Sequence, residues 1–462
     1  MSQQDVHWYP HHLDSQKAVY LAIVEAIEQD LARGVLKGGD KLPAQRQLAA
    51  RLGIDFTTVT RAYQEGKKRG LLVARMGQGT FVRALQSQEN PGDQLIDMGM
   101  NIPPLPQDKR LIERMQRDMA QVVLRLPEQS LFGYKDFFGT FEDRTLVAHW
   151  VAKRYRSAQA DNLLICPGTQ GTLLALLGHL GGKGISICCE EFTYPGFKAV
   201  AENLGIKLVG LAMDHDGILP SAFEDACRSQ KVRALYCTPT QHNPTTTTWS
   251  VERRHAIAEI AKRYDVVLIE DDAYGFISDN APEPLCSFAP ELGYYIAGLA
   301  KSVASGLRVA FLICPDRHFQ QQLSQHLRAT SLMVSPLTKA MALDLIQSGC
   351  ADLLSAAISK AARERQALAY EILKDHSFRA DPNGFHIWLS LPPYWPEESF
   401  INRMRRHNIR LVGSDAFAVG KSFVTGVRLC LGAPNSVEQT RYVLNLIAQQ
   451  LKKPDDYQNA IV

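Results

Sequence analysis

The hydrophobic residues near the N-terminus recur first at helical spacing and then at strand spacing. Over residues 15–32, apolar side chains lie three or four positions apart, which predicts an amphipathic helix. Pro43 suits the first turn of a second, short helix, and a third helix is predicted to begin at Thr57 or Thr58. Two stretches of strand composition on either side of a glycine-rich turn complete the pattern. The order of these elements predicts a winged helix over residues 1–85.

A different pattern begins at residue 95, after a short polar stretch at 86–94 that we interpret as a linker. Apolar runs of strand length then alternate with helical patterns, which is typical of a mostly parallel sheet covered by helices on both faces. We therefore expect an α/β domain over residues 95–462, with a smaller C-terminal α+β subdomain over about 360–455. The predicted strands of the main sheet are Leu163–Cys166, Ile185–Cys189, Lys207–Leu211, Ala234–Cys237, Val266–Glu270, Tyr295–Gly298 and Val309–Cys314, and those of the subdomain are His386–Leu391 and Val427–Leu431.

Composition and charge narrow the class of protein. The chain has 462 residues, of which 45% are hydrophobic and 21% charged, as in an ordinary globular protein with more than one core. No apolar run has membrane-spanning length, the N-terminus lacks a signal-peptide pattern, and the nine cysteines include no C-x-x-C pair. We expect a cytoplasmic protein without membrane segments, disulfides or a metal site. Residues 41–83 carry nine Lys or Arg against two Asp or Glu, a net charge of +7 compared with +3 for the whole chain, which predicts contact with a phosphate backbone.

The third predicted helix leaves polar side chains outside its buried stripe. Thr57, Thr58, Thr60 and Arg61 are free to meet base edges and phosphates if this helix enters the major groove of DNA. Double-stranded DNA is therefore the expected macromolecular partner.

Three segments of this region resemble the GntR family of bacterial regulators. They are Leu42–Ala49, Thr58–Tyr63 and Gly77–Val82. The resemblance implies that Arg46 contacts DNA and that Gly79 lies at the tip of a wing in the minor groove. The basic residues at 67–69 either hold phosphates or form only a solvated helix end.

Residues at the predicted strand ends of the C-terminal domain suit pyridoxal 5'-phosphate. Lys301 follows an apolar strand, and Arg308 lies seven residues further on, so an amine is available for an aldimine and a cation for the phosphate. Asp271 ends a buried strand, where a carboxylate can keep the pyridine nitrogen protonated. Tyr274 and Asn243 can donate to the phenolic oxygen of the cofactor.

The phosphate and the ring of the cofactor have further candidate partners. Gly168, Thr169 and Gln170 lie between a strand and the start of a helix, so their backbone N–H groups and the helix dipole face a dianion. Tyr194 either stacks on the ring or belongs to the core. Of the two adjacent aspartates, Asp271 is favoured as the functional one, because it precedes Tyr274 by three residues. Asp272 is then interpreted as a surface cap.

Taken in order, these segments resemble fold-type-I aminotransferases over about residues 96–455. The resemblance implies that Arg428 binds the carboxylate of a substrate or effector, and that the protein forms a head-to-tail homodimer. Tyr134 either reaches the site of the neighbouring subunit or belongs to the core.

The sequence departs from the aminotransferase pattern beside the lysine. Gly298 and Ala300 stand where hydroxyl residues are common in these enzymes. Binding of the phosphate must then rest on Thr169, Arg308 and backbone amides, with Ser302 as a further candidate.

A GntR-type head fused to an aminotransferase-like body resembles the MocR branch of the GntR family. This implies a dimeric transcription regulator in which an amino compound exchanges onto the Lys301 aldimine and shifts the conformation of the body. The alternative is a working aminotransferase of amino acids with an accessory DNA-binding head, and residual transamination is compatible with either hypothesis. A regulator without the cofactor is disfavoured by the joint presence of Lys301, Asp271, Tyr274 and Arg308.

Overall fold

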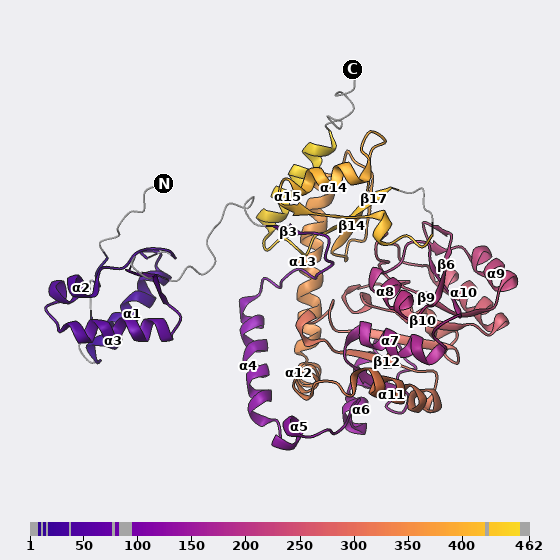
Figure 1. Ribbon diagram of the computed structural model, residues 1–462, viewed down its shortest axis with the longest axis horizontal. Helices are drawn as coiled ribbons and strands as arrows, with labels where there is room; N and C mark the ends of the chain where they lie inside the picture. Colours follow the sequence, from indigo (N-terminus) through magenta and orange to yellow (C-terminus); the bar gives the residue numbers. More distant parts are fainter. Residues whose placement is uncertain are drawn as a thin grey trace. The chain divides into compact units, whose positions relative to one another are not determined.

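The computed structural model divides the chain into two compact units, Met1–Gln94 and Leu95–Val462, here called the N-terminal and the C-terminal unit (Figure 1). The predicted linker at 86–94 lies outside the described residues. The structure describes residues 8–10, 13–14, 17–36, 38–75, 79–82, 95–420 and 425–452.

The N-terminal unit has the predicted winged-helix fold. Its helices are α1 (Val19–Ala32), α2 (Gln45–Leu52) and α3 (Phe56–Lys68). The wing is an antiparallel pair of strands, β1 (Leu72–Arg75) and β2 (Gly79–Val82).

The three helices meet in a core to which each contributes fully buried side chains. Ile23 and Ile27 of α1 pack with Leu48 of α2 and with Val59 and Tyr63 of α3. The positions of these residues follow the helical period of the sequence, which is why the fold could be predicted.

The start of α3 is set by a side-chain cap. Oδ1 of Asp55 accepts a hydrogen bond from the backbone N–H of Thr57, at 2.7 Å, as an N-cap residue does. The helix therefore begins at Phe56, slightly earlier than predicted, because the aspartate and not a threonine provides the cap.

The C-terminal unit is built on a seven-stranded sheet with the order β4-β12-β11-β10-β9-β5-β6. The strands are β4 (Leu163–Cys166), β5 (Ser186–Glu190), β6 (Lys207–Leu211), β9 (Val232–Cys237), β10 (Val267–Asp271), β11 (Gly293–Gly298) and β12 (Ala310–Ile313). All neighbours are parallel except β12, which is antiparallel to both β11 and β4. The prediction of a mostly parallel α/β sheet is confirmed.

Each face of this sheet has its own hydrophobic core, because side chains alternate between faces along a strand. Leu163 and Ile165 of β4 point into one core, and Leu164 and Cys166 point into the other. The first face is covered by α6 (Phe141–Val151), α9 (Pro220–Ser229), α10 (Val251–Tyr264) and α12 (Pro336–Gln347), and the second by α7 (Gly168–Leu180), α8 (Pro195–Asn203) and α11 (Arg317–Ser331).

A smaller subdomain contains the second sheet, which has the order β13-β14-β17-β16 (Figure 1). Its elements are β13 (Phe378–Ala380), β14 (His386–Ser390), α14 (Glu397–Arg405), β16 (Val412–Gly413), β17 (Gly426–Cys430) and α15 (Val437–Leu451). The long helix α13 (Cys350–Ile372) packs against α15 in this subdomain and against α12 beside the large sheet. Among the described residues, no single helix is long and apolar enough to cross a membrane; α12 and α13 meet that test only as a pair bent by 83°.

The first residues of the C-terminal unit also join the subdomain. The short strand β3 (Ile96–Asp97) pairs in parallel with β15 (Ile409–Arg410). The chain then crosses to α4 (Lys109–Arg125) and α5 (Glu128–Phe132). This crossing brings the segment after β3 over the end of the large sheet.

Candidate functional site

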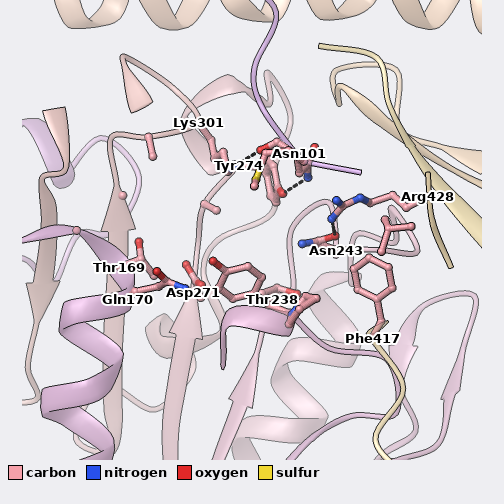
Figure 2. Close-up of a pocket in the computed structure, with 18 of the residues that line it drawn as sticks. Asn101, Thr169, Gln170, Thr238, Asn243, Asp271, Tyr274, Lys301, Phe417 and Arg428 are labelled. Atoms are coloured by element: carbon pink, nitrogen blue, oxygen red, sulfur yellow. Dashed lines mark hydrogen bonds between the residues drawn. The ribbon is translucent and has the colours of Figure 1, made fainter. Parts of the chain in front are cut away.

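A cavity of about 360 Å³ lies where β4, β10 and β11 end at the same edge of the large sheet (Figure 2). This is the edge where open α/β sheets bind their ligands. Of the pocket residues predicted from the sequence, all but Tyr134 and Ser302 line the cavity, and Tyr134 lies elsewhere with 70% of its surface exposed. The cavity is lined by the predicted residues Gly168, Thr169, Gln170, Tyr194, Asn243, Asp271, Tyr274, Lys301, Arg308 and Arg428.

Lys301 presents its amine inside this cavity. The residue follows β11, and its Nζ donates to the backbone oxygen of Asn101. Burial lowers the pKa of Lys301 to about 8, because the charged form loses its hydration. The neutral amine, which is the nucleophilic form, is therefore accessible near physiological pH.

Asp271 is the acceptor at the base of the cavity. It ends β10 and is 4% exposed, and the hydroxyl of Tyr236 donates to its Oδ2 at 3.0 Å. Its Oδ1 is buried and has no hydrogen-bond partner among the described residues. Burial raises the pKa of Asp271 to about 7. The ring of Tyr236 is fixed in turn by stacking on Phe197, with centroids 3.8 Å apart and planes at 6°.

Arg428 of β17 lies across the cavity from the lysine (Figure 2). Its Nη1 donates to Oδ1 of Asn243 at 2.7 Å, and its Nη2 donates to the backbone oxygen of Gly99. The guanidinium lies 5.0 Å from the ring centroid of Phe417. Burial lowers the pKa of Arg428 from its usual value, and Nε has no partner in the part of the chain that is described. The arrangement places a buried cation where a carboxylate can enter.

Asn101 is a pocket residue that the sequence did not reveal. Its Nδ2 donates to the hydroxyl of Tyr274 at 2.7 Å, and its Oδ1 is buried without a partner among the described residues (Figure 2). No motif surrounds Asn101, and it reaches the cavity because β3 pairs with β15 and the backbone oxygen of Met98 accepts from the N–H of Cys430 in β17. Sequence spacing contains no signal for such a tertiary contact.

The other end of the cavity is shaped by glycines. Gly168, the first residue of α7, has φ +80°, and a Cβ there would lie 3.0 Å from Nη2 of Arg308. A Cβ at Gly298 would lie 2.8 Å from Oγ1 of Thr169. The space of a side chain at position 298 is thus filled by the threonine hydroxyl, which gives a physical reason for the departure seen in the sequence. Ser302 is buried, but it is not one of the residues that line the cavity as the structure describes it.

The expectation that Asp272 is a surface cap was wrong. The residue is 1% exposed, and its Oδ2 accepts from Nε of Arg154 at 2.9 Å and from the hydroxyl of Tyr295 at 2.8 Å. Asp271 ends strand β10 and Asp272 follows it directly, so both carboxylates reach the interior, and Arg154 supplies the opposite charge for Asp272. Asp272 therefore supports the fold behind the pocket, whereas Asp271 faces the cavity.

In the N-terminal unit, several side chains predicted to read DNA already have intramolecular partners. The hydroxyl of Thr57 donates to the capping carboxylate of Asp55, and that of Thr60 donates to Oε1 of Gln45 at 3.0 Å. The guanidinium of Arg61 lies over the ring of Tyr20, 4.1 Å from its centroid.

The other predicted contacts lie at the surface with different neighbours. Arg46 is exposed, with its guanidinium 5.8 Å from the ring centroid of Phe56. Thr58 is half-buried, and Gly79 is exposed at the start of β2 with φ +117°. Of the basic residues at 67–69, Arg69 pairs with two glutamates of its own unit, at 3.1 and 3.4 Å, whereas Lys67 and Lys68 are exposed and stay the candidates for phosphate contact.

Family comparisons assign both units. Residues 93–447 match the family described as aminotransferase class I and II. The chain belongs to this family. Residues 19–82 match the bacterial regulatory proteins of the gntR family, so the aminotransferase domain follows a gntR-type helix-turn-helix domain. This is the MocR-type arrangement that the sequence predicted.

Two HTH-type transcriptional regulators are similar to this chain over most of its length. The HTH-type transcriptional regulator YdeF of Bacillus subtilis is 29% identical over 451 residues, which are 96% of each protein. The HTH-type transcriptional regulator TauR of Rhodobacter capsulatus is 26% identical, covering 83% of this chain and 87% of TauR. Among solved structures, an archaeal alanine:glyoxylate aminotransferase has a TM-score of 0.70 at 24% identity, with 86% of this chain and 95% of that chain covered. The structural likeness establishes the fold of the aminotransferase domain.

The aminotransferase class I and II fold implies pyridoxal phosphate as the cofactor, and the cavity fits this group. The unpaired buried Oδ1 of Asp271 is an acceptor for a protonated ring nitrogen, and Lys301 presents its amine inside the cavity, hydrogen-bonded to the backbone oxygen of Asn101. Gly168 leaves backbone N–H groups and Arg308 open to an anion at the start of α7.

Proposed function

We propose that this protein is a DNA-binding transcription regulator that senses an amino compound in the pocket around Lys301. The observation that carries the proposal is that one chain combines this buried amine, with Asp271 and Arg428 around it, with a gntR-type helix-turn-helix. The gntR-type domain implies binding to double-stranded DNA, and the place of action is therefore the bacterial cytoplasm.

The cofactor gives the pocket its selectivity for amines. Pyridoxal phosphate supplies an aldehyde carbon that condenses with primary amines and a ring that withdraws electrons. Asp271 accepts from the ring nitrogen, and Tyr274 and Asn243 face the phenolic oxygen. Tyr194 covers the ring.

The phosphate and the effector occupy opposite ends of the pocket. Backbone groups of Gly168, Thr169 and Gln170 hold the phosphate together with Arg308. Arg428 binds the carboxylate of an amino-acid effector, because it is a buried cation whose Nε has no partner in the described structure. An effector that carries both an amine and a carboxylate satisfies both ends.

The protein acts as a head-to-tail homodimer. Leu124 of α4, Phe132 of α5 and Tyr134 expose 78%, 88% and 70% of their surfaces. Exposed apolar side chains of this size on consecutive elements support an interface with a second copy. In that dimer, Tyr134 reaches the pocket of the partner, which accounts for its distance from the pocket of its own chain.

A working aminotransferase of amino acids is the second candidate. It is favoured by the lowered pKa of Lys301, because a neutral lysine can also move protons during turnover. The two candidates differ in whether the amine is consumed and in whether DNA binding is specific.

Two measurements on the full-length, cofactor-loaded protein distinguish them. In the first, DNA sequences are enriched from a random pool by the protein, and the affinity for them is measured at two salt concentrations. In the second, the absorption spectrum of the protein is followed during titration with amines and amino acids. We expect specific, salt-dependent binding to the enriched DNA and a spectral change that saturates without sustained release of a keto acid. Sustained turnover together with failure to enrich any sequence would leave the aminotransferase as the function.

A further inference from the structure

The first residue of the recognition helix α3 is an exposed aromatic side chain. Phe56 is 42% exposed, although a phenylalanine gains most by being buried. The core beneath α3 is already formed by Val59, Ala62 and Tyr63, which are fully buried. The position of Phe56 is fixed by the Asp55 cap, so the ring is presented at the N-terminal end of the helix.

This end of a recognition helix is the part that contacts base edges in the major groove. The neighbouring hydroxyls of Thr57 and Thr60 are hydrogen-bonded inside the unit. Beside these two polar side chains, Phe56 therefore offers DNA an apolar contact.

Arg46 links the ring to the basic surface. Its guanidinium, at the start of α2, lies 5.8 Å from the ring centroid of Phe56, so that a cation and an apolar ring share one exposed patch. A patch of this kind is complementary to DNA, because the cation meets the negative potential and the ring meets an apolar group on a base. The apolar group in the major groove is the 5-methyl of thymine.

We propose that Phe56 reads thymine through its 5-methyl group, so that each half-site of the operator contains a T·A pair opposite the start of α3. The proposal rests on the DNA-binding function proposed above and adds a named base and the residue that reads it. Arg46 holds the ring in place and faces the adjacent base pair or its phosphate.

The test removes the methyl group and the ring separately and together. DNA enriched from a random pool by the full-length protein is synthesised with thymine and with deoxyuridine, first throughout and then at one position at a time. Wild type and Phe56→Ala are titrated against each form. For the wild type we expect about a fourfold loss of affinity for each contacted thymine, the value typical of one buried methyl group. For Phe56→Ala we expect weaker binding and equal affinity for both forms at that position.

Two further variants control for loss of folding and for the removal of any exposed apolar side chain. Val35→Ala removes an apolar side chain outside α2 and α3 that is even more exposed than Phe56 (55% against 42%) and should keep the wild-type ratio of thymine to deoxyuridine affinities. Phe56→Leu retains an apolar contact and should keep part of the ratio, which separates recognition from loss of folding.

The outcomes separate the two proposals. If the protein enriches DNA but binds the thymine and deoxyuridine forms equally, or if Phe56→Ala keeps the wild-type ratio, the thymine proposal is wrong and the regulator proposal stands. If no sequence is enriched, the regulator proposal fails with it.

Discussion

In the C-terminal unit most ionisable side chains that line the pocket are buried or half-buried, with Arg308 as the exposed exception, whereas in the N-terminal unit the arginines of α2 and α3 lie at the surface. Burial moves the pKa of Lys301 to about 8 and that of Asp271 to about 7, so each group is near the point where it changes charge. Arg46 and Arg61 instead rest on aromatic rings that the same unit provides.

Whether a side chain is buried or exposed determines what its geometry reveals about ligand binding. A buried group is held by the fold, so its geometry already shows which atom is available for a ligand. A side chain at the surface can exchange its intramolecular contacts for contacts with DNA. The structure of the free protein therefore shows which intramolecular contacts are lost on binding. We therefore expect large, salt-independent effects of substitutions in the pocket and smaller, salt-dependent effects in the helix-turn-helix.

Lys301→Ala should have the largest effect, because it removes the only pocket amine in the described structure. Reduction with borohydride followed by mass spectrometry should find the cofactor attached to the wild type and absent from the variant. Lys198→Ala is the matched control, since Lys198 does not line the pocket and binds the backbone oxygens of Asp415, Ala416 and Ala418, at 3.5, 3.1 and 2.6 Å. Cofactor retained covalently by Lys301→Ala would contradict the assignment.

The pH dependence of cofactor attachment tests whether the amine of Lys301 is desolvated. The pKa of Lys301 is lowered in the folded protein from 10.5 to about 8, so half of the amine is neutral near that pH and nearly all of it is neutral well above it. The rate at which the wild-type apoprotein attaches the cofactor, followed by absorbance, should rise with pH and level off above about 8. A rate that is still rising near pH 10 would mean that the lysine is not desolvated.

Substitutions of Asp271 and Asp272 should have different effects on stability and on cofactor binding. Asp272→Ala leaves Arg154 buried without its partner, a loss that typically costs about 3–5 kcal/mol of stability. Asp271→Ala should instead weaken cofactor binding with less loss of stability, because Asp271 bears no ion pair in the described structure. Denaturant unfolding of the apoproteins and cofactor titration measure the two effects, and equal behaviour of the variants would contradict the division of roles.

Substitutions on α3 should have intermediate effects that depend on the DNA. Arg61→Ala should cost about 1–3 kcal/mol on enriched DNA and little on random DNA if the guanidinium leaves Tyr20 for a base edge. Lys68→Ala should weaken binding to both DNAs similarly and lower the salt slope by about one unit. Titrations at two salt concentrations test this; an equal loss for Arg61→Ala on both DNAs would leave it as a backbone contact only.

The smallest effect is expected at the cap of α3. The hydrogen bonds from Thr57 lower the pKa of Asp55 below 3.8, so the stabilisation is present above that value and is lost as pH falls through the lower folded pKa. Asp55→Ala should slightly lower the thermal midpoint of the N-terminal unit at neutral pH, and the difference from the wild type should vanish in acid. A difference that does not depend on pH would mean that the carboxylate charge is not what caps the helix.

The sequence predicts the pocket better than it predicts the DNA-reading surface. In a parallel sheet, residues at successive strand ends converge by construction, so Asp271, Lys301 and Gly168 could be placed together from their order along the chain. Asn101 could not, because it is brought there by the pairing of β3 with β15 and by the contacts of its segment with β17. The burial of Asp272 depends on Arg154, more than 100 positions away, and no local pattern indicates that partner.

On α3, periodicity identifies the exposed face but not the contacts within it. Thr57 and Thr60 were correctly placed outside the buried stripe, yet their hydroxyls bond to neighbours that a helical projection does not include. Phe56 was overlooked because the helix was predicted to begin after it.

One titration tests whether occupancy of the pocket changes DNA binding. The affinity of the full-length, cofactor-loaded protein for its enriched DNA is measured with increasing concentrations of an amine that alters the absorption spectrum, in parallel with Arg428→Ala. We expect the DNA affinity to change severalfold over the same concentration range as the spectrum, and for Arg428→Ala we expect both transitions to move together to higher concentrations of an amino acid. A spectrum that saturates while the DNA affinity stays constant would mean that the pocket does not control DNA binding.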